Sequence, residues 1–246
     1  MTPWSRIERF IVRRALGTLT HVNTTEPLAA LTFDDGPDPA STLPLLGVLE
    51  AAGARGTFFM LGRNARRLPD MVRRVVDGGH VVGHHTEDHP SLPMLPRAQR
   101  LRQMRLGMEA LGPLATRFFR PPYGHQTLFT RYDAASLGFH VVAWDVVPID
   151  WLDHSVDFML ARVAEKMRPG SILLLHDVLF DALDPSQADR SRLLALVQAI
   201  LEEFHGQYRF VTVPELLRNG RPHYENWQLV GDREFMRQLS PTQLEV

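Results

Sequence analysis

Two adjacent carboxylates stand directly after an apolar run near the start of the chain. Residues 32–38 read TFDDGPD, with Asp34 and Asp35 side by side before a Gly-Pro turn. Carboxylates are rarely buried without a partner, and such a turn lets two of them face one site. Either one could complete a metal site. Asp, Gly and Pro are also ordinary turn residues, so this motif alone is weak evidence.

A group of histidines follows in residues 84–89, which read HHTEDH. His85 and His89 have a metal-ligand spacing, which would place both imidazoles on one side of a helical turn. Two neutral imidazoles and one carboxylate, from Asp34 or Asp35, suit a borderline divalent ion and leave positions for water and substrate. We expect Zn²⁺ first, and Co²⁺ or Ni²⁺ also suit these donors. The alternative is that the histidines are surface or core residues.

Three later clusters carry further polar residues. Residues 120–124 read RPPYG, and their prolines stiffen a loop that would present Arg120. Residues 144–151 contain Asp145 and Asp150. A last cluster places His176 at the end of an apolar run, where an imidazole could act as general acid or base near neutral pH.

The elements that must position these clusters alternate along the chain. Short apolar runs predict strands at residues 29–33, 57–61, 80–82, 118–119, 141–144, 172–175 and 209–213. Helical spacing of apolar residues predicts helices at residues 42–52, 68–77, 96–111 and 192–204. This alternation indicates βαβ units and a mainly parallel sheet, either open or closed into a barrel. In both cases the active site belongs at the carboxyl ends of the strands, where the polar clusters stand.

Taken in order, the five clusters resemble the motifs of the NodB-type polysaccharide deacetylases, carbohydrate esterase family 4. The family pattern runs TFDDGP, HTxxH, RxPY, a DxxDW-like segment and LxH. The resemblance covers about residues 28–218. It implies an α/β fold, a distorted (β/α) barrel of about seven strands.

The resemblance also implies roles for the residues that match the motifs. Asp35, His85 and His89 match the metal ligands of the family. Asp34 matches the catalytic base, and His176 matches the general acid.

Five further positions match supporting residues of the family. Arg120 matches the residue that orients the base through an ion pair, and Asp150 matches the partner of the acid. Tyr123 matches the position whose backbone N–H helps to form the oxyanion hole. Leu174 matches a wall of the acetyl pocket, and Trp151 would line the groove beside it.

The function implied is a metal-dependent hydrolase that removes N-acetyl groups from an amino sugar in an oligo- or polysaccharide, or in a lipid-linked precursor. A metal-activated water, an aspartate base and a histidine acid would perform the reaction. Two alternatives stay open: a hydrolase of the same fold that acts on another C–N bond or an O-acetyl ester, and a catalytically silent carbohydrate-binding domain.

Two positions depart from the family pattern. Val147 stands where the fourth motif usually has an aspartate, and the nearest carboxylate is Asp145. His84 precedes the first histidine ligand, where the pattern more often has asparagine. We expect His84 at the surface or next to the metal ligands.

Composition limits the partners and the location. The chain has 246 residues, a net charge of −1 and no cysteine, so it has no electrostatic footprint for nucleic acid and no thiolate ligand or nucleophile. No apolar stretch is long enough to span a membrane, and the first residues do not form a signal peptide. We therefore expect a cytoplasmic protein, with the inner membrane surface as a second location.

The two ends of the chain differ from its middle. We divide the sequence into an N-terminal amphipathic segment over residues 1–25, a polysaccharide deacetylase (NodB homology) domain over 26–219, and a C-terminal tail of unknown role over 220–246. Residues 3–16 predict an amphipathic helix with basic residues, which either packs on the domain or contacts an anionic membrane. The oligomeric state is not predicted.

Overall fold

A parallel sheet of seven strands forms the centre of the protein. A computed structural model describes residues 16–180 and 188–231, so the helix predicted over residues 3–16 lies almost wholly outside the described residues. The strands of the sheet follow the order β6-β5-β4-β3-β2-β7, and β8 pairs with β2 beyond this path. Their bounds are β2 Leu28–Asp34, β3 Gly56–Met60, β4 Val81–His84, β5 Ala115–Phe119, β6 His140–Val141, β7 Ile172–His176 and β8 Arg209–Phe210.

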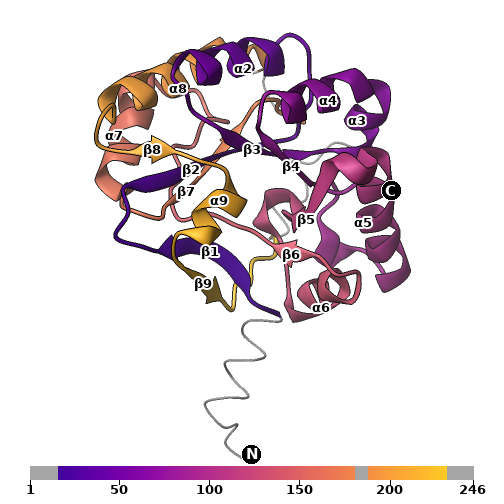
Figure 1. The fold of residues 1–246 in the computed structure, drawn as a ribbon. Coiled ribbons are helices and arrows are strands. Elements are labelled where there is room, and N and C mark those ends of the chain that lie inside the picture. Colours follow the sequence, from indigo (N-terminus) through magenta and orange to yellow (C-terminus); the bar gives the residue numbers. More distant parts are fainter. Residues whose placement is uncertain (1–15, 181–187, 232–246) are drawn as a thin grey trace, which may run out of the picture.

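The sheet curls because the chain after β6 runs back toward β7. Val142 bridges to Leu19, and Val146 bridges to Leu173 of β7, in both cases in parallel. This segment therefore connects the two outer strands, and the predicted distorted (β/α) barrel is confirmed. A second sheet pairs β1 (Thr18–Asn23) with β9 (Arg221–Glu225) antiparallel, and Figure 1 shows the two strands side by side beneath the main sheet.

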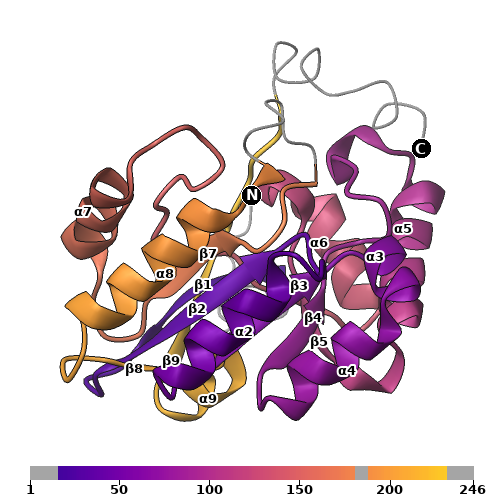
Figure 2. The same ribbon diagram turned by 90° about the horizontal axis from the view of Figure 1, so that it is seen from above.

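Helices cover the outside of the curled sheet, as Figure 2 shows for α2, α3, α4 and α8. Their bounds are α2 Thr42–Ala51, α3 Gly62–Arg67, α4 Pro69–Asp77, α5 Arg97–Leu111, α6 Leu128–Ser136, α7 Val156–Lys166, α8 Ser191–Glu203 and α9 Val213–Arg218. Short 3₁₀ turns occur at Leu92–Met94, Gly112–Leu114 and Pro122–Gly124. Among the described helices, none has the length and apolar character needed to cross a bilayer.

The core explains why β2 has a continuous apolar run rather than an alternating one. Every residue of β2 is buried, with Leu31 and Phe33 in the cluster beneath the helices and Ala30 in the cluster on the other face. Parallel strands covered on both faces have this pattern. Asp34 is the last residue of β2 and lies where the strand leaves the core.

The strands and helices predicted from the sequence are all present, although several bounds differ. The run predicted at residues 209–213 ends as a strand at Phe210, and α9 begins at Val213. Helices α3, α6, α7 and α9 and strands β1 and β9 were not predicted. Buried Leu19 and Val22 join β1 to the core, so the structure ties part of both predicted ends to the domain.

Two glycines set the distance between α3, α5 and the loop that follows β4. A Cβ built at Gly107 of α5 would lie 2.6 Å from the carbonyl carbon and oxygen of Thr86. A Cβ at Gly62 of α3 would lie 2.7 Å from the Cα of Gly107. Backbone atoms therefore meet with no room for a methyl group, and α5 packs directly against the loop that carries His85 and His89.

We predict that Gly107→Ala destabilises the protein by about 1–3 kcal/mol, because the added methyl group must push α5 away from the Thr86 backbone. Gly47→Ala is the matched control, since Gly47 lies inside α2 with no atom within 4 Å of its built Cβ. Higher helix propensity should make that variant about 0.5–1 kcal/mol more stable. Urea unfolding of both variants measures the difference. Equal effects of the two substitutions would contradict the packing described here.

Candidate active site

The predicted site residues meet at the carboxyl ends of neighbouring strands. Asp34 ends β2 and lies opposite His176 in the register with β7. His85 follows the last residue of β4, and Arg120 follows the last residue of β5. The strand order thus brings together residues that are far apart in the sequence, at the end of the sheet where α/β enzymes hold their catalytic groups.

Asp34 forms a buried ion pair with Arg120. The guanidinium Nη1 donates to Asp34 Oδ1 at 2.7 Å, and Arg120 is fully buried. Its Nε and Nη2 donate to the carbonyl oxygens of Val142 and Ala143, and its charge lies 4.1 Å from the centre of the Phe59 ring. Because every side of the guanidinium is in contact, Asp34 has one fixed orientation.

The neighbouring carboxylate, Asp35, lies beside two histidines and not beside Arg120. Asp35 Oδ1 lies 3.4 Å from His85 Nε2 and 3.3 Å from His89 Nε2, and all three residues are buried. His85 Nδ1 lies 2.6 Å from the carbonyl oxygen of Arg120, so Nδ1–H donates there and Nε2 keeps its lone pair.

The polar atoms of this group fit a divalent ion. Asp35 Oδ2 accepts a hydrogen bond from the Phe180 N–H, but Oδ1 is buried without a hydrogen-bond partner. Burial, with the charge of Asp34 adding to it, raises the pKa of Asp35 to about 7. Leaving Asp35 Oδ1 buried and unpaired is costly. This oxygen and the two imidazole nitrogens form a donor set that is typical of zinc and similar ions.

Backbone strain marks the same loops. Asp35, Thr86, His89, Tyr123 and Ile149 all have positive φ, at 75°, 72°, 62°, 58° and 69°. Non-glycine residues in this region cost energy and cluster where a site requires a particular orientation. Because Thr86 and His89 have positive φ, the helical turn predicted for His85 and His89 was wrong. The two ligand candidates lie on an irregular loop.

His176 and Asp150 form the second titratable pair. His176 Nδ1 lies 3.0 Å from Asp150 Oδ1, and the His176 N–H donates to Asp150 Oδ2. Arg190 also donates to Asp150 Oδ2. Burial alone would lower the pKa of His176, but the charge of Asp150 and its hydrogen bond outweigh burial and raise that pKa above its usual value.

The other predicted residues surround these pairs. Tyr123 lies in the Pro122–Gly124 turn, with its ring 4.4 Å from the His89 ring. The Trp151 ring meets the His176 ring edge to face at 5.3 Å. Leu174 is buried two residues before His176 on β7, and alternation along a strand puts both side chains on the same face.

Comparison with known proteins shows which family the chain belongs to. The polysaccharide deacetylase family matches residues 21–142. The chain is also 33% identical over 223 residues to a peptidoglycan-N-acetylglucosamine deacetylase of Bacillus cereus. The aligned region covers 89% of this chain and 77% of the relative. The chain belongs to the polysaccharide deacetylase family. It is therefore an enzyme of a class of hydrolases that act on carbon–nitrogen bonds other than peptide bonds.

Two further relatives agree with this membership. A chitooligosaccharide deacetylase of Sinorhizobium fredii is 37% identical over 166 residues, which is 66% of this chain and 77% of the relative. The crystal structure of a peptidoglycan N-acetylglucosamine deacetylase in complex with 4-naphthalen-1-yl-N-oxidanyl-benzamide superposes with a TM-score of 0.76. It is 29% identical and covers 89% of this chain and 100% of that chain.

Several residues of this deacetylase site were not predicted. Buried Asp177 accepts a hydrogen bond from the Thr42 hydroxyl at the start of α2. A Cβ at Gly36 would lie 2.3 Å from Asp177 Oδ2, so Asp177 supports the turn that carries Asp34 and Asp35. Its position directly after His176 is the one sequence signal that could have suggested this role.

Two residues that hydrogen-bond to the site come from segments without a sequence motif. Arg190 stands directly before α8 and donates to Asp150 and to the carbonyl oxygen of His176. Trp227, in the predicted tail, donates from Nε1 to the carbonyl oxygen of Gly124 at 3.1 Å. The residues around Arg190 and Trp227 in the sequence do not indicate a site. Each contact joins two segments that are far apart in the sequence, so only the folded structure reveals it.

His84 differs from both expectations stated for it. It is fully buried, and its ring stacks on Phe119 at 4.6 Å and meets Phe139 edge to face at 4.4 Å. Burial lowers the pKa of His84 to about 3, so the ring is neutral. His84 points into the aromatic packing behind β4 because it alternates with His85 along the chain.

Asp145, the carboxylate nearest to Val147 in the sequence, does not replace the aspartate that the family pattern has at that position. Asp145 accepts hydrogen bonds from the Ile172 N–H and from Arg168, which tie it to the start of β7. Asp145 is therefore a structural residue of the barrel closure, whereas Asp150 of the same motif contacts His176 and Arg190.

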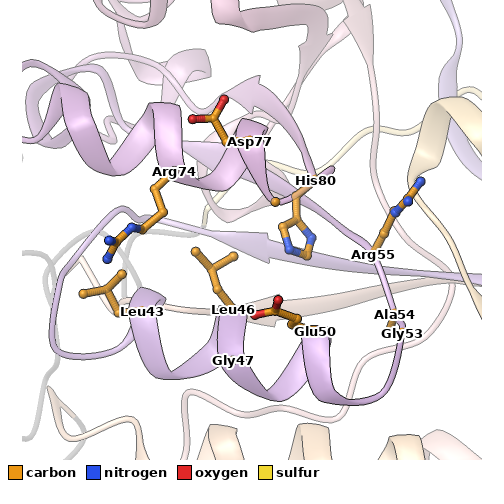
Figure 3. A pocket seen from close by; sticks show the side chains of 11 residues that line it. Leu43, Leu46, Gly47, Glu50, Gly53, Ala54, Arg55, Arg74, Asp77 and His80 are labelled. Atoms are coloured by element: carbon orange, nitrogen blue, oxygen red, sulfur yellow. The ribbon is translucent and has the colours of Figure 1, made fainter.

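A pocket of about 580 Å³ lies away from these residues. Leu46 and Glu50 of α2, Arg74 and Asp77 of α4, and His80 line it (Figure 3). His80 stands just before β4, so this pocket is at the amino ends of the strands. The candidate site residues lie at the opposite end, and the pocket is not part of that site.

We predict that Arg120→Ala costs about 3–5 kcal/mol of folding stability, because it leaves the Asp34 carboxylate buried without its partner. Arg209→Ala is the control, since the Arg209 side chain is 63% exposed in its pair with Glu215. That variant should lose less than about 1 kcal/mol. Urea unfolding at neutral pH compares them, and similar losses in both variants would show that the buried pair does not hold the site together.

Proposed function

We propose that this chain removes the N-acetyl group from an amino sugar within an oligosaccharide, a polysaccharide or a lipid-linked precursor. The observation that carries the proposal is the division between two adjacent carboxylates: Arg120 holds Asp34, while Asp35 faces two histidines. The names of the relatives, which are deacetylases of peptidoglycan and of chitooligosaccharides, support an N-acetylated sugar as substrate.

Asp34 acts as the general base in this proposal. Its Oδ1 is occupied by Arg120, whereas Oδ2 lies 3.9 Å from His85 Nε2 and so faces the group of metal-ligand candidates. Oδ2 is therefore the atom that accepts the proton of the attacking water. A divalent ion bound by Asp35, His85 and His89, with Zn²⁺ favoured, would polarise the acetyl carbonyl and lower the pKa of that water.

His176 acts as the general acid. Its Nδ1–H donates to Asp150, so Nε2 is left to give a proton to the nitrogen of the leaving amine. An amine leaves from an amide only when it is protonated, and the charge of Asp150 favours the imidazolium. The products are acetate and a free amino group. Backbone N–H donation by Tyr123 and contacts from Leu174 and Trp151 with the substrate stay predictions from the family pattern.

Acetate release tests the proposal. Protein treated with chelator and then reloaded with Zn²⁺ or Co²⁺ should release acetate from N-acetylglucosamine oligomers, and chelated protein should not. We predict that Asp34→Asn lowers kcat by about 10²–10⁴-fold, because the amide cannot take the proton. Circular dichroism of the variant checks that it folds.

Substrates that differ only at the bond distinguish the alternatives. His176→Gln should slow release from N-acetyl oligomers more than release from O-acetylated sugars, because an alkoxide leaves without prior protonation more readily than an amine. Release from O-acetylated sugars alone would identify an esterase. Metal binding without release from any substrate would favour a silent carbohydrate-binding domain, and either result contradicts the proposal.

The pH dependence of kcat tests the acid. Because its pKa is raised, His176 stays protonated up to higher pH than an ordinary histidine, and the rate falls as the pH rises through that pKa. Asp150→Asn removes the charge that raises this pKa, so the basic limb should move to lower pH. Asp153→Asn is the control, because exposed Asp153 of the same loop pairs with Arg192. A basic limb that stays in place in Asp150→Asn would exclude His176 as the acid.

The location of the protein is a separate proposal. A cytoplasmic enzyme would act on a soluble oligosaccharide or, at the inner membrane surface, on a lipid-linked precursor. Contact of residues 3–16 with the membrane stays a prediction, and deletion of these residues with unchanged binding to anionic vesicles would remove it.

A further inference from the structure

A second group of metal-ligating side chains lies on the sheet formed by β1 and β9. His21, His223 and Glu225 each place one ligand atom within 4.8 Å of the others. Over the described ranges 16–180 and 188–231, the same criterion is met by one other group, Asp35 with His85 and His89. The second group shares no residue with the catalytic machinery.

The strand register builds this group. His21 and His223 are direct partners across the antiparallel pair, and their rings stack at 4.3 Å with 19° between the planes. Glu225 follows His223 by two residues and therefore lies on the same face of β9. Its Oε1 is 3.5 Å from His223 Nε2.

A β-bulge adds a fourth polar group. The register shifts between Leu19 and His21, so Thr20 is the extra residue of β1. The bulge brings the Thr20 hydroxyl within 3.2 Å of His21 Nδ1 and within 3.2 Å of Glu225 Oε1, to which it donates. A hydroxyl that contacts two members of the group orients them, as outer-shell groups do at metal sites.

Burial and charge suit entry of a cation. His21 is buried, whereas the side chains of His223 and Glu225 are 36% and 46% exposed, which leaves a path from solvent. The charges of Arg168 and Glu225 both act on His21, with opposite effects on a bound cation. The charge of Arg168 is compensated by Asp145 at 2.9 Å.

We propose that His21, His223 and Glu225 form a second divalent metal site, which takes Zn²⁺ or a similar ion and clips β9 to β1. Two imidazoles and one carboxylate are the donors of many zinc sites, and a water could complete the coordination. The register places the two imidazoles face to face, and rotation of one ring about its Cβ–Cγ bond would direct both nitrogen lone pairs toward one ion.

The clip would act on the catalytic loop through the chain that follows β9. Two residues after Glu225, Trp227 donates to the carbonyl oxygen of Gly124, and Leu229 exchanges backbone hydrogen bonds with Gln126. An ion that fastens β9 thus fastens the segment that lies against the Tyr123 turn. The proposed role is structural, and it does not depend on which substrate the enzyme cleaves.

Zinc stoichiometry of the full chain tests the proposal. Protein freed of metal by chelator is dialysed to equilibrium against micromolar Zn²⁺, and bound zinc is measured by elemental analysis. We expect two ions per chain in the wild type, one in His223→Gln, and one in the double variant His85→Gln/His89→Gln. His205→Gln, which changes an exposed histidine at the end of α8, is the control and should keep two.

Thermal unfolding gives a second readout. In the His85→Gln/His89→Gln background, Zn²⁺ should raise Tm, because an ion that binds only the folded state stabilises it. Adding His223→Gln should abolish that rise without changing Tm in the absence of metal. One ion per chain in the wild type, lost on changing His85 and His89, would overturn the proposal. Two ions per chain in His223→Gln would also overturn it.

Discussion

The buried ion pair between Asp34 and Arg120 is the interaction on which the rest of the site depends. Through its guanidinium, Arg120 joins β2 to the carbonyl groups of the segment that closes the barrel. Its own carbonyl oxygen accepts the Nδ1–H of His85, so the same residue also sets the orientation of a metal-ligand candidate. A buried charge pair stabilises a fold only when its remaining groups are satisfied. Each guanidinium nitrogen of Arg120 has an acceptor, whereas Asp34 Oδ2 faces the metal-ligand candidates.

Two carboxylates next to each other in the sequence can do different chemistry because the backbone turns between them. The φ of 75° at Asp35 directs its side chain toward the histidines, whereas Asp34, still in β-register, meets Arg120. The surroundings sustain this strained conformation: Asp177 packs against Gly36, and the Phe180 N–H donates to Asp35. Strain at the site is thus offset by hydrogen bonds and close packing around it.

The barrel and the main site residues could be predicted because the sequence pattern carries them. Apolar runs followed by polar clusters predicted β2, β4, β5 and β7, and motif order predicted Asp34, His85, Arg120 and His176 as neighbours. Contacts made across the fold left no such pattern: Arg190, Trp227 and the His21–His223 pair depend on which strands meet. His84 was misplaced because local spacing does not reveal which side of a strand end faces the aromatic core. The loop conformation of His85 and His89 depends on tertiary packing against Gly107, which periodicity does not report.

In the proposed function, Asp35, His85 and His89 bind the ion while Asp34 stays outside its coordination as the base. An anomalous difference map at the zinc edge, from crystals of the zinc-loaded protein, tests it most directly. We expect a peak bonded to Asp35 Oδ1 and to Nε2 of both histidines, with Asp34 still paired to Arg120. A peak bonded to Asp34, or the absence of any peak among these residues in zinc-loaded crystals, would contradict it.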